Sequence, residues 1–145
     1  MTLSQALLDV FNTNFVAYYR SHTAHINIVG RNFTSDHKLL GKVYETLQAD
    51  IDTIGEFVRT VNEFVPESLE IVGDASKIAY DQDVFGSADD LLETVLTDLG
   101  TLVGLYRTLD EQATDEDQKQ ISNFAQDRIT ALDKYMWMLR STLEE

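Results

Sequence analysis

Apolar residues recur every three or four positions along four long segments of the chain, and this spacing predicts four α-helices. The first covers residues 3–29 and the second residues 34–62, while the third begins at Ser87 and the fourth near Thr114. No alternation of apolar and polar residues, which would indicate a β-strand, competes with them. The positions predicted to face the core are, in chain order, Leu7, Phe11, Phe15, Tyr18, His22, Ile26, Leu40, Val43, Leu47, Ile51, Ile54, Val58, Val61, Leu92, Leu96, Leu99, Val103, Tyr106, Ala125, Ile129, Leu132, Met136, Leu139 and Leu143.

Residues that favour helix ends stand near these boundaries. Gly30 is expected at the C′ position after the first helix, and Pro66 disfavours helix in the residue before it. The Ser-Ala-Asp-Asp sequence that begins at Ser87 is typical of a capped helix start. Three side chains can cap the second helix: Thr34, Ser35 and Asp36. Three acids are expected in the first turn of the fourth helix, either as favourable charges at the helix N-terminus or as the lining of an ion-entry pore: Asp115, Glu116 and Asp117.

The connection between the second and third helices, roughly residues 65–86, is long enough to cross a bundle. Its Pro-Glu-Ser-Leu-Glu-Ile-Val stretch predicts a short helix, with Pro66 near the first turn. The fold class expected is therefore all-α: a four-helix bundle with a short helix in the long connection between helices two and three. A chain of 145 residues suits a single domain, which we place over residues 1–145.

The composition narrows the classes of function. The formal net charge is −14, from 25 acids and 11 bases, and such a surface repels nucleic-acid phosphate, so we expect DNA binding to be absent or weak. The chain has no cysteine, which excludes disulfides and thiolate metal sites and suits a reducing cytoplasm. Neither a signal peptide nor an apolar run of membrane-spanning length is recognisable, so we expect a cytoplasmic protein without membrane contact.

All three histidines lie between residues 22 and 37. His25 is near the end of the first helix and His37 near the start of the second, so the two imidazoles are expected at the same end of the helical hairpin. Asp52 and Glu56 are four residues apart on the second helix, almost opposite its core stripe. A solvated acidic face would explain the acids alone. Together with two histidines, however, they form a ligand set that suits iron, manganese or zinc.

One straight helix cannot bring His37 and Asp52 to the same ion. They are fifteen residues apart, which is about 22 Å along a helix axis. If His25, His37, Asp52 and Glu56 bind metal together, a second subunit must supply half of the ligands. A two-fold interface would form two such sites, because it is isologous and the same surface of each subunit takes part. The Glu-x-x-His motif of in-bundle di-iron proteins is absent.

At these residues the sequence resembles the Dps family, the miniature ferritins of bacteria. The family pattern has a His followed by Trp-Asn, then Gly, Phe and a second His, and later Asp-x-x-x-Glu. Here the corresponding segments are AHINIVGRNF, DHKLL and DIDTIGE. The final LDKYMWMLRSTL also resembles the last helix of the family. The resemblance covers nearly the whole chain.

The resemblance implies a ferritin-like fold and a homo-dodecamer around a hollow cavity. It implies di-iron ferroxidase sites at the two-fold interfaces, where Fe(II) is oxidised by hydrogen peroxide or oxygen before Fe(III) mineral is stored. The catalytic and metal-binding residues would be His25 and His37 of one subunit with Asp52 and Glu56 of the other. Zinc is a possible substitute for iron. The alternative is a non-catalytic protective or DNA-associated cage that binds zinc or no metal.

Several residues depart from the family pattern or have a second interpretation. Ile26 replaces the family Trp, so we expect this protein to handle peroxide differently. No Lys-rich tail, which the DNA-binding members carry, is present, and Asn123 stands where the pore is often acidic. His22 is interpreted as a core histidine whose hydrogen bonds are satisfied rather than as an auxiliary ligand. Two aromatic residues are interpreted as packing or interface residues rather than redox relays: Tyr44 and Trp137.

Overall fold

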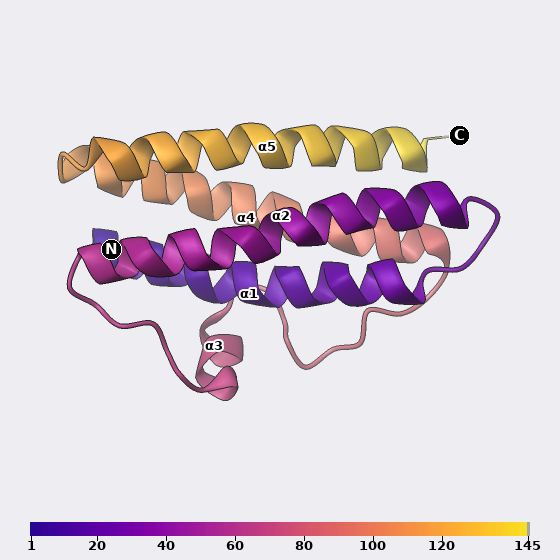
Figure 1. Cartoon of the computed structure of the whole chain (residues 1–145), viewed down its shortest axis with the longest axis horizontal. Coiled ribbons are helices and arrows are strands. Elements are labelled where there is room, and N and C mark those ends of the chain that lie inside the picture. The colour runs from indigo at the N-terminus through magenta and orange to yellow at the C-terminus, as the bar shows by residue number, and fades with distance from the viewer. Residues whose placement is uncertain (145) are drawn as a thin grey trace.

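The computed structural model describes residues 1–144 and contains five helices in that range. They are α1 (Leu3–Asn27), α2 (Phe33–Thr60), α3 (Leu69–Ala75), α4 (Ala88–Asp115) and α5 (Lys119–Leu143). Figure 1 shows the four long helices side by side, with the short α3 outside them. Residues 1–144 include no strand. The predicted all-α four-helix bundle, with a short helix in its long connection, is therefore confirmed.

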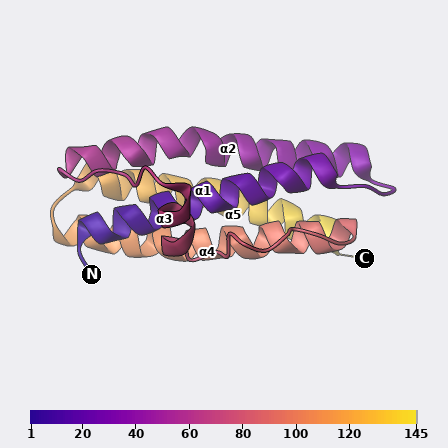
Figure 2. The same cartoon turned by 90° about the horizontal axis from the view of Figure 1, so that it is seen from below.

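The connection between α2 and α4 sets the topology of the bundle. α1 and α2 form one antiparallel hairpin, α4 and α5 form another, and α1 contacts α4. The connection runs along the outside of the bundle from one end to the other, so α2 and α4 point in the same direction (Figures 1 and 2). As a result, the end of α1, the start of α2 and the start of α4 meet at one end. None of the helices described is long and apolar enough to cross a membrane.

Most of the predicted core positions are confirmed, but the second half of the α1 stripe was assigned to the wrong face. Phe15, Tyr18 and His22 are only half-buried, and Ile26 is 62% exposed. The face of α1 that enters the core there consists mainly of small residues, which allow close helix packing and give a weak apolar signal. The buried residues of that half are Val16, Ala17, Ser21, Ala24 and Ile28.

The predicted helix starts were only partly correct. Ser87 caps α4 in a full capping box with Asp90, as expected. α2 begins one residue earlier than expected, after Asn32, and none of the three candidate side chains caps it. Gly30 has φ 137° but lies beyond the α1 C-cap, Ile28, so it is not the residue that ends the helix. The short helix α3 is capped by Ser68 rather than opened by Pro66.

The fourth long helix starts later than the sequence predicted. α4 continues to Asp115, and a tight turn with Asp117 at φ 57° precedes α5 at Lys119. The first turn of α5 contains no acid, so the predicted helix N-terminal charges are wrong. Glu116 instead accepts a hydrogen bond from the backbone N–H of Leu3, at 3.0 Å. This acid therefore satisfies a free donor at the start of α1.

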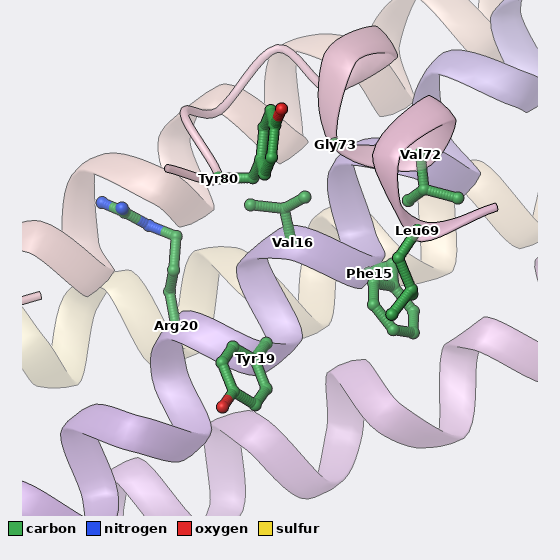
Figure 3. A pocket seen from close by; sticks show the side chains of 8 residues that line it. All are labelled: Phe15, Val16, Tyr19, Arg20, Leu69, Val72, Gly73 and Tyr80. Carbon is green, nitrogen blue, oxygen red and sulfur yellow. The ribbon is translucent and has the colours of Figure 1, made fainter. Parts of the chain in front are cut away.

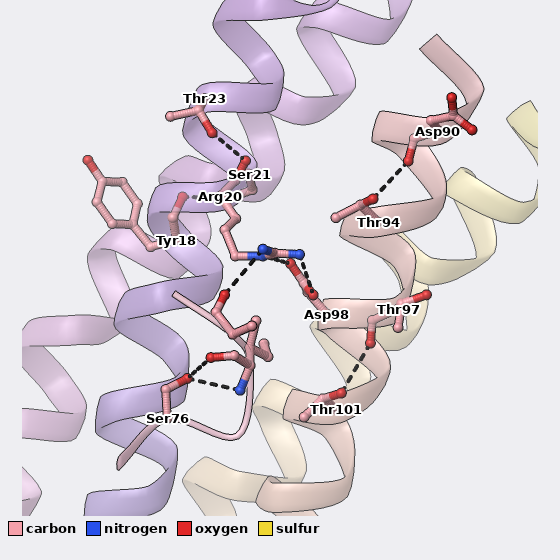
Figure 4. A network of polar contacts seen from close by, with 12 residues as sticks. Tyr18, Arg20, Ser21, Thr23, Ser76, Asp90, Thr94, Thr97, Asp98 and Thr101 are labelled. Atoms are coloured by element: carbon pink, nitrogen blue, oxygen red, sulfur yellow. Dashed lines mark hydrogen bonds and ion pairs between the residues drawn. The ribbon is translucent and has the colours of Figure 1, made fainter. Parts of the chain in front are cut away.

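A buried ion pair fastens the long connection to the bundle. Arg20 of α1 donates from Nε to Asp98 of α4 at 2.7 Å, and from Nη1 to the carbonyl oxygen of Ala79 at 3.2 Å (Figure 4). Both charged side chains are largely buried. The hydroxyl of Thr13 accepts from the backbone N–H of Lys77 at 2.9 Å. α1 therefore positions the irregular segment that follows α3.

A second buried ion pair joins α2 to α5. Arg128 lies 3.2 Å from Asp50, whose residue is only 6% exposed. Burial raises the pKa of the Asp50 carboxyl to about 6, although Arg128 acts in the opposite direction. The pKa of the nearby buried Tyr106 is also raised by burial. The interior of the bundle thus contains a cluster of polar side chains, in which the carboxylate of Asp50 is paired with Arg128.

Candidate metal centre

His25 and His37 lie face to face where α1 leads into α2. Their ring centroids are 3.7 Å apart and their planes differ by 16°. The Nδ1 atom of His25 is 2.6 Å from the carbonyl oxygen of His37, and Nδ1 of His37 is 2.7 Å from the carbonyl oxygen of His25. The hairpin therefore brings the two histidines together, as the sequence predicted.

These reciprocal hydrogen bonds determine which nitrogen of each ring is free. A carbonyl oxygen can only accept, so Nδ1 of both His25 and His37 must carry a hydrogen. In a neutral imidazole the Nε2 atom then has the lone pair, which is the form that binds metal. Backbone carbonyls that fix a histidine in this way are a common outer layer of protein metal sites. The pair thus offers two oriented nitrogen donors.

Gly41, one turn after His37 on α2, leaves the space that the His25 ring occupies. A Cβ atom at this position would lie 3.1 Å from Cε1 and 3.3 Å from Nδ1 of His25, which is tighter than ordinary packing. The absence of a side chain at Gly41 therefore allows α1 and α2 to approach closely at the histidine pair.

Asp52 and Glu56 lie one turn apart on α2, and both side chains are exposed. They line a shallow hollow on the outer side of the α1–α2 hairpin, together with Phe11, Gly55 and Arg59. The buried stripe of α2 faces the other way, as predicted. The two carboxylates can therefore reach a ligand or a partner without disturbing the core.

The single chain does not bring the histidine pair and the carboxylate pair together. Among residues 1–144, no three His, Asp or Glu side chains converge on a position where they could hold a metal ion. His37 and Asp52 lie on the same continuous helix, fifteen residues apart, or about 22 Å along its axis. Each pair is thus only half of the predicted ligand set, and a second chain would have to complete that set.

Sequence reasoning missed the aromatic surroundings of the histidines. Tyr44 stacks on His22 with ring centroids 3.8 Å apart, and Phe33 lies 4.9 Å from His37. His22 is half-buried rather than in the core, and its Nδ1 atom is 2.9 Å from the hydroxyl of Tyr18. The prediction that its hydrogen bond is satisfied is correct. The four-residue spacing from Tyr18 to His22 was the available signal.

A separate hollow lies between α1 and α3 (Figure 3). Its walls are mainly apolar, with Phe15, Leu69 and Val72 among them, and the ring of Tyr80 stands against Gly73. The lining contains no carboxylate or histidine. It is therefore not a competing metal site.

Comparison with known proteins identifies the fold. A family model described as "Ferritin-like domain" matches residues 4–145. The DNA protection during starvation protein of Brevibacillus brevis is 26% identical over 130 residues, which cover 89% of this chain and 86% of that protein. The crystal structure of Helicobacter cinaedi CAIP is 26% identical with a TM-score of 0.90, and the match covers 99% of this chain and 100% of that one.

A further structure, Dps from Vibrio cholerae O1, is described as a member of a broad superfamily of ferritin-like diiron-carboxylate proteins. It has a TM-score of 0.91 at 23% identity, covering 98% of this chain and 89% of that one. The resemblance to Dps proteins is thus confirmed, and the family model that matches residues 4–145 shows that the chain belongs to the ferritin-like family.

Proposed function

We propose that this protein oxidises Fe(II) at sites shared between two subunits and stores the Fe(III) product as mineral inside a closed cage. The observation that carries the proposal is the division of the ligand set into two preformed halves on one chain. His25 and His37 present free Nε2 atoms, while Asp52 and Glu56 present carboxylates on an exposed helical face. Membership in the ferritin-like family supports the same conclusion.

Each half of the ligand set has a separate chemical role. Asp52 and Glu56 would attract Fe(II), and they favour Fe(III) still more because carboxylates are hard anionic ligands. The neutral imidazoles of His25 and His37 would complete the substrate site without adding charge. The reaction proposed is the oxidation of two Fe(II) by one hydrogen peroxide, which takes up two protons and gives two Fe(III) and two water molecules. Oxygen is the alternative oxidant.

The assembly proposed is a homo-dodecamer in which two-fold interfaces each form two sites. The outer face of the α1–α2 hairpin, with the adjoining α3 segment, is the region available for this contact. Its exposed apolar residues support such a role, among them Tyr19, Leu69 and Ile71. Light scattering should give the mass of twelve 16.4 kDa chains. A stable monomer at micromolar concentration would contradict both the cage and the shared site.

Iron oxidation tests the assignment of the carboxylates and histidines. After anaerobic loading with Fe(II) and addition of peroxide, the wild type should develop ferric absorbance rapidly. Glu56→Ala and the His25→Ala/His37→Ala double variant should lose this fast phase while retaining the cage mass. Glu45→Ala, which removes another exposed acid of α2, is the matched control and should retain it. An unchanged fast phase in Glu56→Ala would refute the site.

Mixing the two variants tests whether the site is shared. When Glu56→Ala and His25→Ala/His37→Ala chains are dissociated and reassembled together, some two-fold interfaces combine an intact histidine pair with an intact carboxylate pair. Partial recovery of the fast phase is therefore expected only in mixed cages. Verified mixed cages without recovery would mean that the ligands do not come from different chains.

The second candidate is a non-catalytic cage, either protective or associated with DNA, that binds zinc or no metal. The name of the Brevibacillus brevis relative favours this possibility. The net charge of −14 argues against direct DNA contact. Slow oxidation of iron by the wild type, combined with tight zinc binding that depends on His25 and His37, would favour this candidate.

A further inference from the structure

Each of the four long helices contributes one polar side chain to the middle of the bundle. They are Asn14 of α1, Asp50 of α2, Tyr106 of α4 and Arg128 of α5, and we call these four residues the mid-bundle layer. The first three are buried, and the Arg128 side chain is 21% exposed. Polar atoms in such a position need hydrogen-bond partners, because an unpaired buried donor or acceptor destabilises the fold.

Hydrogen bonds place three members of the layer at one level. The Nδ2 atom of Asn14 donates to the carbonyl oxygen of Leu47 at 2.9 Å, and Leu47 is about one turn before Asp50 on α2. The Nη1 atom of Arg128 lies 3.2 Å from Asp50. Asn14 and Arg128 therefore approach α2 within about one turn of each other.

Aromatic packing brings Tyr106 to the same place. The ring of Phe124 lies 6.0 Å from the guanidinium carbon of Arg128, and its centroid is 6.0 Å from that of the Tyr106 ring. The charges of Asp50 and Arg128 also act on the pKa of Tyr106, although burial is the main cause of its rise. Tyr106 thus faces the ion pair from the opposite hairpin.

Three atoms of the mid-bundle layer are buried without a hydrogen-bond partner among residues 1–144: Oδ1 of Asn14, the hydroxyl of Tyr106 and Nε of Arg128. The amide orientation of Asn14 is determined, because the Leu47 carbonyl can only accept and so must face Nδ2. The other guanidinium nitrogens of Arg128 are used by Asp50 and Asp127. One atom each from α1, α4 and α5 is therefore left to bind something else.

The chemistry of these three atoms suits water. Nε of Arg128 can only donate, Oδ1 of Asn14 can only accept, and the Tyr106 hydroxyl can do either. A water molecule both donates and accepts, and buried waters typically make about three hydrogen bonds. A metal ion fits poorly, because the layer has one carboxylate and that carboxylate is already paired with a guanidinium. An anion would face the same carboxylate of Asp50.

The bundle is also less tightly closed on this side. The backbones of α2 and α5 approach each other less closely than those within either hairpin. Long polar side chains span the distance instead, as Arg128 does to Asp50 and Tyr135 does to Thr46. A small molecule is accommodated more readily there than between the helices of one hairpin.

We propose that ordered water is bound at the centre of the mid-bundle layer by Asn14, Tyr106 and Arg128. Ferritin-like di-iron proteins can build a metal centre in the bundle core from side chains on facing helices. In this chain the polar side chains on facing helices bind water instead, so the core takes no iron. The inference does not depend on the iron chemistry proposed for the subunit contacts.

Crystallography of the assembled protein tests the ligand directly. A high-resolution map should show a water peak within hydrogen-bond distance of at least two of the three atoms. Anomalous diffraction from crystals soaked in zinc should show no peak in the layer. Absence of the water peak, or an anomalous zinc peak at this position, would overturn the inference. Neither result bears on whether the cage oxidises iron.

Removal of one hydroxyl gives a second test, whose direction separates the alternatives. If the Tyr106 hydroxyl has no partner, Tyr106→Phe removes an unsatisfied buried group and should raise the urea midpoint. If water binds it, the same change takes a partner from that water and should lower the midpoint, which is the result we expect. Tyr135→Phe, which loses the hydroxyl paired with Thr46, is the reference for such a decrease. An unchanged or raised midpoint for Tyr106→Phe, at equal assembly state, would contradict the bound water.

Discussion

At the scale of single residues, Gly41 controls the position of a proposed ligand that it does not itself provide. Its missing side chain leaves room for the His25 ring, and a Cβ atom there would lie 3.1 Å from Cε1. We expect Gly41→Ala to displace the ring and slow peroxide-driven iron oxidation, although all four proposed ligands remain. Stopped-flow ferric absorbance measures this effect.

Gly104→Ala is the matched control for that change. No heavy atom lies within 4 Å of a Cβ built on Gly104, which is exposed on α4. This substitution should leave oxidation unchanged and stabilise the helix by about 0.5–1 kcal/mol. Equal oxidation rates in both variants would show that the close packing at Gly41 does not position His25.

Asp50 makes stability depend on pH in a direction opposite to that of an ordinary surface acid. Burial raises its pKa from 3.8 to about 6, so between these values the folded protein holds this proton more tightly than the unfolded chain does. The contribution of Asp50 to stability should therefore fall as pH rises from about 4 to about 6, and stay lower above that. Asp50→Asn should lack this dependence.

The measurement is urea unfolding of wild type and Asp50→Asn at pH 4, 5, 6 and 7, with assembly state monitored. The difference in unfolding free energy should shift in favour of Asn by about 2.4 kcal/mol between pH 4 and pH 7. Arg128 stays charged throughout, so loss of the pair adds only a constant offset. A difference that does not vary with pH would contradict the assignment.

At the scale of elements, Arg20 ties α1 to α4 and to the segment after α3. Its removal would leave Asp98 buried without a partner and free the carbonyl of Ala79. Arg20→Met should therefore destabilise the protein by about 3–5 kcal/mol, as breaking a buried ion pair does. Arg20→Met with Asp98→Leu should recover most of that loss, because no charge remains buried. Denaturant titration compares the three proteins; a loss below about 1 kcal/mol would indicate an ordinary surface pair.

The elements also show why sequence predicted some parts of the structure and not others. α2 and α4 carry continuous stripes of Leu, Val and Ile, so their buried faces could be predicted. The core face of α1 includes Ala17, Ser21 and Ala24, and a stripe of larger aromatics beside it gave the stronger signal. The start of α5 was misplaced because Asp115 and Asp117 resemble helix N-terminal acids. The left-handed backbone of Asp117 determines the turn instead.

The candidate site was predictable in part for similar reasons. Regular helices fix separations along one chain, so the distance from His37 to Asp52 could be derived from numbering alone. The hydrogen bonds from each histidine to the backbone of the other depend on how α1 and α2 approach at Gly41. Neither those contacts nor the stack of Tyr44 on His22 can be obtained from helical periodicity.

At the scale of the whole molecule, the excess of acids makes a prediction about DNA. A chain with a formal charge of −14 should repel phosphate, because only clustered Lys and Arg release counterions on binding. A plasmid mixed with a stoichiometric amount of the protein at neutral pH and physiological salt should migrate unchanged in a gel. The same mixture at low salt serves as the comparison, since electrostatic binding would be strongest there. Retention at physiological salt would contradict the prediction.

The reciprocal hydrogen bonds of the histidine pair separate two tasks on each imidazole ring. The bonds that link the end of α1 to the start of α2 use Nδ1, whereas metal would bind at Nε2. The Nδ1 atoms that hydrogen-bond the two helices together and the Nε2 atoms proposed to bind metal thus lie on opposite edges of the same rings. Loss or exchange of an ion at the Nε2 edge would therefore leave the hydrogen bonds between the two helices in place.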